Sequence, residues 1–525
     1  MQDANVQDAN MQDANMQDAD GQDADVIVIG SGIGGLTAGA LLSRYGKRVI
    51  VCESHAIPGG AAHSFSRQGF HFDSGPSFFA GLSDPNSLNP VRQVLDVLGE
   101  SIAAVPYDPL GHYHFPEGTF PVYGNADRYR EEIAKITPQG AKEYQKFERD
   151  LMQLYRVLQE IPTLTLRSDL NAIPLLLSRY PKSLLKLIPQ IAVLQASAGD
   201  VMNTFVRDPW VRRLIDLECF LLSGLKAEGT VAPEIAFMLG ERSNSVIEYP
   251  VGGSGAIVQA FVRGLERWGG QLRLNAHVEK ILVENRRVVG VRLQRGEVLK
   301  ARTVISNATA WDTCNHLLDP ADTPSFYRKN ALSMPAVDSF MHLHLGIRSD
   351  GLEGLTGHHV VVHDSAQDIT VPGNTCMISI PSVWHENLAP PGHHVIHAYT
   401  LEPHDGWKRD ENYDIRKRER VEPLYRALER VIADIRSRIT LELIGTPLTH
   451  AYYLRRHQGT YGPAIPAGKG MFPSCHTPIA GLYRVGDSTM PGIGVPAVAA
   501  SGILCANTLV KTQQVENLVQ EWNVG

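Results

Sequence analysis

The sequence predicts an α/β fold in which a Rossmann-like domain carries an inserted α+β substrate domain. Three observations predict it. Residues 26–29 form an apolar run that leads into a glycine-rich turn and then into a helically periodic segment. A second apolar run, residues 49–52, ends in an acidic residue. Far along the chain, at residues 482–487, another strand-like segment ends in Gly-Asp, so the first domain resumes after a long interruption.

The turn after the first predicted strand gives each glycine a separate role. Gly30 permits a tight turn, Gly32 lets the backbone approach a pyrophosphate, and Gly35 lets the following helix pack closely on the sheet. That helix, residues 36–45, would present free N–H groups to phosphate oxygens at its N-terminus. Glu53 lies 23 residues after Gly30 and would accept hydrogen bonds from ribose hydroxyls. The spacing therefore predicts a dinucleotide site.

The segment after Glu53 distinguishes FAD from NAD. Gly59 and Gly60 follow the acidic strand end, and a Gly-x-x-x-Asp-x-Gly-Pro turn follows at residues 69–76. This continuation resembles the glutathione-reductase and amine-oxidase class of FAD proteins, and the resemblance implies FAD. No second complete GxGxxG occurs in the sequence. We therefore expect no integral NAD(P) site, and the flavin would be reduced by an external electron donor.

The segment near the C-terminus would complete the flavin site. Gly486 and Asp487 end a predicted strand, which would place a carboxylate on the ribityl hydroxyls. The next helix would begin near Gly494 and Val495, with Pro496 tolerated in its first turn. The N-terminus of this helix would stabilise negative charge at the pyrimidine edge of the flavin.

Length, charge and cysteine content restrict the function. The chain has 525 residues, 43% of them hydrophobic, which is enough for two or three domains. A net charge of −7 argues against a nucleic-acid partner. Six cysteines without a CxxC pair argue against metal clusters and disulfides, and we expect no metal site. No secretory peptide and no apolar run of the ~20 residues needed to span a bilayer is found, which predicts a cytoplasmic protein.

The domains are predicted to be discontinuous. Residues 1–24 are QDAN-type pentapeptide repeats, poor in large apolar groups, and we expect a disordered tail. The boundaries are predicted as follows: the FAD-binding domain at 25–90, 245–330 and 450–515, and the substrate domain, which would face the membrane, at 91–244 and 331–449. Periodicity predicts helices within residues 125–158 and one long charged helix over residues 413–439.

Residues 170–193 have an unusual composition, because leucines alternate with isolated Arg and Lys residues and there are few acidic residues. Two interpretations stay open. The segment forms an amphipathic surface that enters a membrane interface, or it forms a helical hairpin whose apolar face closes an internal tunnel.

Glu218 is the candidate catalytic residue. With Asp216 it interrupts an apolar run, where a carboxyl group has a raised pKa and can transfer protons. The alternative is that it pairs with an arginine, and Arg212 and Arg213 are close in sequence.

The chain resembles the carotenoid (prolycopene) isomerases of plants and cyanobacteria, within the bacterial-type phytoene desaturase superfamily, over residues 25–510. The motifs that carry the resemblance are DLECF at 216–220, YPVGG at 249–253, SNAT at 306–309 with WDT at 311–313, LAP at 388–390 with GHH at 392–394, GTYGP at 459–463, GDS at 486–488 and PG at 491–492. The resemblance implies a long hydrophobic tunnel, peripheral contact with a photosynthetic or plasma membrane, and a poly-cis carotenoid substrate. It also implies that FAD is held by Gly30, Gly32, Gly35, Glu53, Gly59, Gly60, Gly486, Asp487, Gly494 and Val495, with the backbone of Val278 against the adenine.

Three functions are compatible with this resemblance. The leading hypothesis is FAD-dependent cis-to-trans isomerisation of a poly-cis carotenoid, redox-neutral and with the flavin reduced. The second is a carotenoid or retinoid desaturase or saturase. It is favoured by His63, because the isomerases have serines in this neighbourhood and retinol-saturase relatives have a histidine. The third is a non-catalytic carotenoid-binding flavoprotein.

Overall fold

A five-stranded parallel sheet, of order β10-β2-β1-β14-β20, forms the centre of the first part of the molecule. The computed structural model describes residues 21–75, 77–85 and 87–524, so most of the predicted tail at residues 1–24 lies outside the described residues. The strands are β1 (Val26–Ile29), β2 (Val49–Cys52), β10 (Gln271–Arg273), β14 (Thr303–Ser306) and β20 (Leu482–Arg484). All residues of β1 and β2 are buried, as expected for a parallel sheet covered on both faces. The strands predicted at 26–29 and 49–52 are confirmed.

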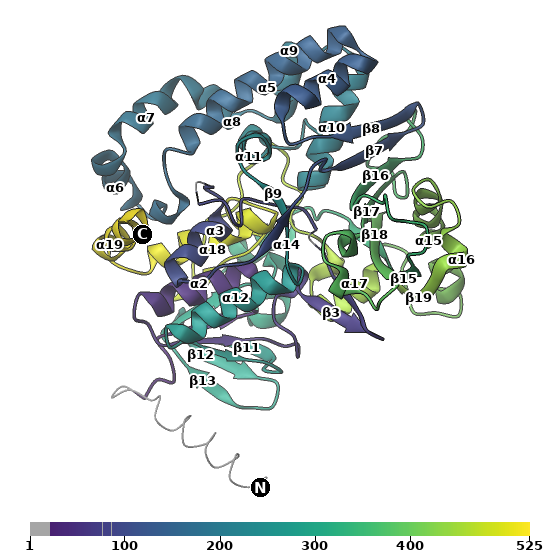
Figure 1. Ribbon diagram of the computed structural model, residues 1–525. Coiled ribbons are helices and arrows are strands. Elements are labelled where there is room, and N and C mark those ends of the chain that lie inside the picture. The colour runs from purple at the N-terminus through teal and green to yellow at the C-terminus, as the bar shows by residue number, and fades with distance from the viewer. Residues whose placement is uncertain (1–20, 76, 86, 525) are drawn as a thin grey trace.

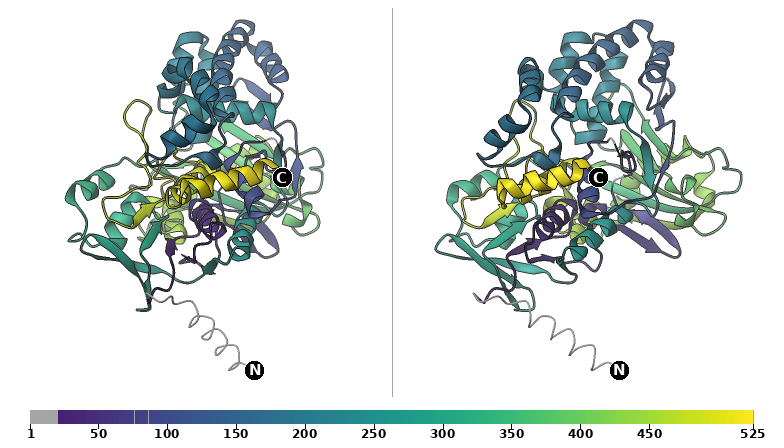
Figure 2. Two further views of the ribbon diagram at one scale, coloured as in Figure 1. Left: turned by 90° about the vertical axis from the view of Figure 1, so that its left-hand side faces the viewer. Right: turned by 60° about the vertical axis from the view of Figure 1, so that its left-hand side comes forward.

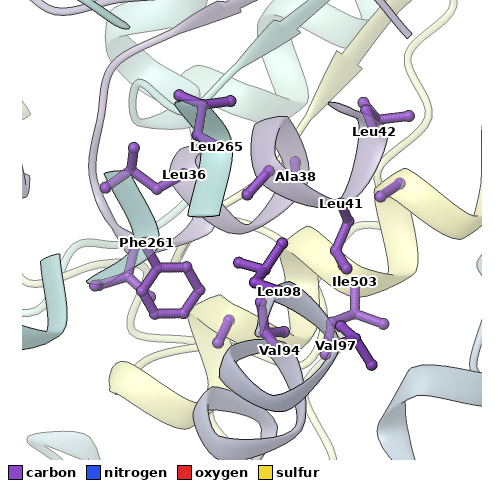
Figure 3. Packing of buried hydrophobic residues seen from close by; sticks show 14 of the residues in the cluster. Leu36, Ala38, Leu41, Leu42, Val94, Val97, Leu98, Phe261, Leu265 and Ile503 are labelled. Atoms are coloured by element: carbon purple, nitrogen blue, oxygen red, sulfur yellow. The ribbon is translucent and has the colours of Figure 1, made fainter. Parts of the chain in front are cut away.

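The two faces of this sheet have different covers. Side chains alternate along a strand, so Val28 packs with the helices and Ile27 packs on the opposite face. Figure 3 shows Leu36, Leu98 and Phe261 converging from three helices in the helical layer. The helices of this layer are α2 (Ile33–Arg44), α3 (Pro90–Leu98), α12 (Ser254–Arg267), α18 (Val495–Thr508) and α19 (Thr512–Val524). The opposite face is covered by the antiparallel strands β11 (Val278–Glu284), β12 (Arg287–Leu293) and β13 (Val298–Lys300).

A seven-stranded sheet forms the second part, on the right in Figure 1. Its order is β19-β15-β18-β17-β16-β7-β8, and its pairs are antiparallel except β7 with β16. Along β15, Met341 and Leu343 face the core under α15, whereas Phe340 lies in another cluster on the opposite face. The strands are β7 (Gly111–Phe115), β8 (Gly118–Val122), β15 (Ser339–Arg348), β16 (His358–Val362), β17 (Thr375–Ser379), β18 (His393–Glu402) and β19 (Ile439–Gly445).

The long helix predicted at residues 413–439 is wrong. The segment contains α15 (Tyr413–Glu429) and the short α16 (Ile435–Arg438), and Ile439 begins β19. Ile432 and Ile435 are both buried in the core below the seven-stranded sheet, and residues 430–434 form turns between α15 and α16. The β-branched residues of this stretch also favour a strand. Tertiary packing therefore overrides the helical periodicity here.

A helical cap, residues 126–244, lies at the top of the molecule in Figures 1 and 2. The helices predicted within residues 125–158 are confirmed as α4 and α5. The cap has its own apolar core, which includes Tyr129, Tyr144 and Phe147. Its helices are α4 (Ala126–Ile136), α5 (Pro138–Leu158), α6 (Ala172–Arg179), α7 (Pro181–Leu187), α8 (Ile191–Gln195), α9 (Ala198–Phe205), α10 (Pro209–Ser223) and α11 (Ala232–Asn244).

The remaining elements connect these parts. They are β3 (Ser64–Arg67), β4 (Phe70–Asp73), β5 (Phe79–Ala80), β6 (Ala104–Pro106), β9 (Ile247–Pro250), α13 (Ala310–Asp312), α14 (Ser325–Leu332) and α17 (Pro447–Leu454). Within residues 21–75, 77–85 and 87–524, no helix has both the length and the apolar character needed to cross a bilayer. The predicted domain boundaries stay a prediction.

Candidate active site

One large cavity, of about 950 Å³, lies between the five-stranded sheet and the seven-stranded sheet. On one side it is lined by turns that follow the carboxyl ends of β1, β2, β14 and β20. On the other side it is lined by β15, β17, β18 and the chain from α17 to residue 461. Ten of the eleven residues predicted to hold FAD line it, namely Gly30, Gly32, Glu53, Gly59, Gly60, Val278, Gly486, Asp487, Gly494 and Val495.

The eleventh residue, Gly35, lies behind the turn and closes it. A Cβ on Gly35 would stand 2.2 Å from the carbonyl oxygen of Gly30. Gly30 itself has φ +91°, a backbone conformation that favours glycine. A Cβ on Gly32 would stand 2.7 Å from Nδ2 of Asn307. Gly30 therefore permits the turn, Gly32 leaves the backbone open to a ligand, and Gly35 permits the close contact of helix α2 with the turn. No side chain caps the N–H groups in the first turn of α2.

Glu53 is fixed at the end of β2. Its Oε2 accepts hydrogen bonds from the backbone N–H of Ser31 (2.9 Å) and from the Ser31 hydroxyl (2.6 Å). Its Oε1 accepts from the backbone N–H of His55 at 2.8 Å. A carboxylate has about four lone-pair positions. The fourth position is taken by the longer bond from the Ser54 hydroxyl to Oε1, at 3.3 Å. The side chain is therefore held in one orientation, and a ribose hydroxyl would take the place of Ser54.

The turns around residues 59–60 and 486–494 keep side chains out of the cavity. Gly59 has φ +117° and Gly486 has φ +95°. A Cβ on Gly60 would stand 3.2 Å from the Cα of Gly32. Gly494, with φ +105°, precedes α18 without a side-chain cap. The result is a cradle of bare backbone on both sides of the first turn of α2.

Two cradle residues were missed by the sequence analysis. Asn307 follows β14 and lies where Cβ atoms on Gly32, Gly35 or Gly486 would fall. Arg456 contacts Asp487, because its guanidinium donates to Oδ2 of that carboxylate. Asn307 could have been found from its position directly after a buried strand at the same sheet edge as Gly30. Arg456 carried no comparable sequence signal.

An apolar and aromatic wall faces the cradle. Phe340 and Tyr461 meet edge to face with ring centroids 4.6 Å apart, and Tyr461 stacks on His450 at 5.1 Å. Met377 and Tyr399 extend this wall. None of the five is predicted as a site residue from the sequence, because they are brought together from four distant segments.

The histidines of this region are uncharged at neutral pH. His342 and His397 lie behind the wall, where Nδ1 of His342 and Nε2 of His397 are 2.9 Å apart. Burial lowers the pKa of both rings well below the usual range. Burial likewise lowers the pKa of His344 and of His450 to about 4. These residues therefore bring polarity, but no positive charge, to the cavity wall.

His63 reaches the cavity from the cradle side. Its Nδ1 lies 2.7 Å from the carbonyl oxygen of Gly60 and 3.1 Å from the hydroxyl of Ser74. A carbonyl oxygen only accepts hydrogen bonds, so Nδ1 carries the proton and Nε2 of the neutral ring is an acceptor. Burial lowers the pKa of His63, which favours this neutral form.

Glu218 does not line this cavity. It lies on α10 beside a second, smaller cavity, and its Oε1 accepts from Nη1 of Arg242 at 2.6 Å. The Tyr129 hydroxyl donates to the same oxygen at 2.8 Å. The suggestion that Arg212 or Arg213 pairs with Glu218 is therefore replaced by Arg242. The catalytic role of Glu218 stays a prediction.

Comparison with known proteins identifies the family. Residues 33–510 match the model of the family described as flavin containing amine oxidoreductase. The chain belongs to this family. Within it, the chain is 36% identical to the chloroplastic prolycopene isomerase of Daucus carota over 92% of this chain and 79% of that protein. It is 32% identical to that of Arabidopsis thaliana over 95% of this chain and 85% of that protein. The resemblance to the prolycopene isomerases is confirmed.

More distant proteins also match. A neurosporene-forming phytoene desaturase of Cereibacter sphaeroides is 27% identical over 91% of this chain and 93% of that protein. A solved oxidoreductase from Methanosarcina mazei has a TM-score of 0.59 at 20% identity, covering 91% of this chain and 98% of that chain. Putrescine oxidase with bound putrescine has a TM-score of 0.57 at 14% identity, covering 95% and 99%. These structures confirm the predicted fold.

The cradle fits FAD, the cofactor of this flavin-containing family. A Cβ on Gly32 or Gly486 would stand 2.7 Å from the Asn307 side chain, so both positions require glycine. Both glycines line the cavity, where they present bare backbone to the cofactor. Free N–H groups of α2 are suited to phosphates, and Glu53 is suited to ribose hydroxyls. The assignment of single residues to parts of FAD stays a prediction.

Proposed function

We propose that this protein catalyses cis-to-trans isomerisation of conjugated C=C bonds in a poly-cis carotenoid, of the prolycopene to all-trans-lycopene type, without net redox change. The observation that carries the proposal is that the FAD cradle and an apolar aromatic wall face one cavity. Identities of 32–36% to prolycopene isomerases over at least 92% of this chain support the reaction type. The FAD would be active in its reduced form, supplied with electrons by an external donor.

The aromatic wall would hold the polyene and exclude water. Phe340 contacts both Tyr461 and Tyr399, with ring centroids 4.6 and 5.7 Å away. These flat rings and Met377 form a surface suited to a flat conjugated chain. When bound, the flavin supplies reversible transfer of electron density to the conjugated chain, which lowers the order of a double bond and permits rotation. Exclusion of water by this wall strengthens the electrostatic interactions made with the polyene.

Charge near the polyene is controlled by neutral groups. His63 and His450 line the cavity, and burial lowers the pKa of each ring, so neither is a cation at neutral pH. The N-terminus of α18, at Gly494 and Val495, also lines the cavity and has no side-chain cap. Its free N–H groups would stabilise negative charge that develops at this side of the cavity.

A net desaturase or saturase is the second candidate function. The acceptor Nε2 of His63 at the cavity favours it, because removal of hydrogen from a polyene needs a proton acceptor. The phytoene desaturase relative at 27% identity also supports it. Glu218 would act as a proton donor in either reaction only if substrate reaches the second cavity.

The redox state of the flavin decides between catalysis and mere binding. Purified holoprotein would be incubated anaerobically with tetra-cis-lycopene in liposomes, once with oxidised and once with pre-reduced flavin. We expect all-trans product only with the reduced flavin. Equal rates in both states would contradict a role for reduced flavin. Absence of product in both states would leave a carotenoid-binding flavoprotein without catalysis.

We further propose that α6, α7 and α8 form a peripheral membrane contact. Of the two interpretations of residues 170–193, the exposed side chains favour the amphipathic surface, since Leu170 is 85% exposed and Leu185 is 66% exposed. Lys186, which pairs with Glu160, lies among them. The other large apolar side chains exposed on this surface are Ile173, Leu177, Ile188 and Ile191.

Flotation with liposomes tests the membrane contact. The double variant Leu177→Glu, Leu185→Glu should lose flotation, because charged groups would have to enter the headgroup boundary. The control is Phe326→Glu with Ile415→Glu, which places two charges at exposed apolar positions outside the helical cap. Equal loss in both double variants would contradict the assignment to α6–α8.

A further inference from the structure

The large cavity that contains the FAD cradle is called the flavin cavity below. In the described part of the chain, a second cavity of about 170 Å³ adjoins it. Leu221, Leu222, Met377 and Tyr399 line both cavities and therefore stand between them. Met377 has a flexible, unbranched side chain that can change conformation at little cost. Tyr399 is held by stacking on His397, with ring centroids 4.9 Å apart. The partition between the cavities therefore combines a fixed ring with movable aliphatic groups.

The second cavity has one charged wall, and its other sides combine apolar side chains with the polar residues Ser77, His112, Tyr113, His358 and His359. Its sides include Leu110, Val122, Met238, Val360 and Ile378. The charged wall contains Arg242 and Glu218, whose side chains are 3% and 2% exposed.

The Arg242 guanidinium is only partly satisfied. Nη1 donates to Oε1 of Glu218 at 2.6 Å, and Nη2 donates to the Tyr144 hydroxyl at 3.0 Å. The buried Nε–H has no hydrogen-bond partner. Buried donors are rarely left unpaired, because a buried donor without a hydrogen-bond partner costs free energy. Arg242 therefore lines this cavity and has one unused donor.

The charge at this wall restricts the acceptor. Glu218 already neutralises Arg242 and accepts further hydrogen bonds from Tyr129 and Tyr144, at 2.8 and 3.4 Å. An anionic ligand would be repelled by the Glu218 carboxylate, and a hydrocarbon end has no acceptor. A neutral hydroxyl or carbonyl oxygen fits both conditions.

We propose that the second cavity is a terminal subsite for a polyene whose end carries a neutral oxygen acceptor. The oxygen accepts a hydrogen bond from Nε of Arg242, and the chain passes Leu222, Met377 and Tyr399 into the flavin cavity. The inference rests on the proposed function, because it requires the flavin cavity to hold a polyene. It goes beyond that function by assigning an oxygenated polyene, in addition to a hydrocarbon, as the substrate class.

Equilibrium binding tests the subsite without requiring turnover. The probes are two all-trans C40 polyenes of equal length in detergent micelles, one a hydrocarbon and the other with terminal hydroxyls. Binding to the holoprotein is followed by quenching of its tryptophan fluorescence. The wild type should bind the hydroxylated polyene about tenfold more tightly, the usual value of one hydrogen bond to a charged group. In Arg242→Lys, which lacks Nε, this preference should disappear.

Controls separate the outcomes. Arg130→Lys changes another arginine of the helical cap, paired with Glu148 and outside both cavities, and should keep the preference. Met377→Trp fills the partition and should also abolish the preference, so the test remains decisive if Arg242→Lys does not fold. Equal affinities in the wild type, or an unchanged preference in Met377→Trp, would overturn the subsite alone. If neither polyene binds the wild type, the proposed function itself fails.

Discussion

Replacing Gly35 by alanine should separate helix α2 from the turn before it. The new Cβ would stand 2.2 Å from the carbonyl oxygen of Gly30 and 3.1 Å from Cβ of Asn307. Both neighbours are fixed, since Gly30 begins the turn and Asn307 follows β14 directly. Because Cβ atoms in real proteins essentially never come closer than 3.0 Å, the start of α2 must retreat by most of an ångström.

The size of the effect follows from two opposing contributions. Overpacking of a close contact costs about 1–3 kcal/mol. Alanine in place of glycine within a helix stabilises the folded state by about 0.5–1 kcal/mol. We therefore expect the free energy of unfolding to fall by about 1–2 kcal/mol. The same movement displaces the N–H groups that face the cradle, and the affinity for FAD should fall about tenfold.

The assay is the ratio of flavin to protein after purification, with thermal unfolding measured at increasing FAD concentration. The control is Gly39→Ala, four residues further along the same buried helix. Its new Cβ would meet a methyl group of Val51 at 3.0 Å, a contact that a shift of a few tenths of an ångström relieves. Gly39→Ala should retain FAD. If Gly35→Ala binds FAD as tightly as the wild type, the argument for the third glycine is wrong.

Three further changes test separate parts of the site. Glu218→Gln leaves the buried Arg242 charge uncompensated and should lower the unfolding free energy by about 3 kcal/mol. The double change Glu218→Met, Arg242→Met should recover most of this loss in urea unfolding, and a double variant no more stable than Glu218→Gln would contradict the buried ion pair as the cause. Burial lowers the pKa of His344 from 6.5 to about 4. Between pH 6.5 and about 4 the imidazole is therefore protonated in the unfolded state but not in the folded state. The free energy of unfolding should then decrease as the pH falls through this range. Urea unfolding at pH 7 and pH 5 should show a smaller loss in His344→Phe, and an identical loss would contradict the buried neutral ring. His63→Ser should leave the product ratio unchanged in an isomerase, and chromatography showing fewer desaturated products would instead favour the desaturase.

The cradle could be predicted because its signals are local. Gly30, Gly32 and Gly35 lie within six residues of one another, and each has a backbone reason to be glycine. Glu53 ends the next strand at the same sheet edge, so its place also follows from the order of the strands. These positions depend on short-range geometry, which sequence patterns record well.

The aromatic wall could not be predicted in the same way. Phe340 and Tyr461 meet only because β15 and the chain after α17 come together in the folded protein. Neither lies in a spacing that indicates chemistry.

The partner of Glu218 illustrates the same limit on helices. Arg212 and Arg213 precede it by six and five residues, positions that do not share its helix face. Arg242 reaches it from α11, since the two helices both belong to the helical cap. Nearness in sequence was therefore a misleading guide to the ion pair.

The mass of the product and the number of turnovers per flavin test the central proposal most directly. Holoprotein with pre-reduced FAD would be given a large excess of tetra-cis-lycopene under anaerobic conditions, and the products would be separated and weighed by mass spectrometry. The account predicts many molecules of all-trans product per flavin, each with the mass of the substrate. Product with two hydrogens more than the substrate, formed once per reduced flavin, would contradict it and identify a saturase. Product with two hydrogens fewer, formed once per flavin in a parallel incubation with oxidised FAD, would contradict it and identify a desaturase.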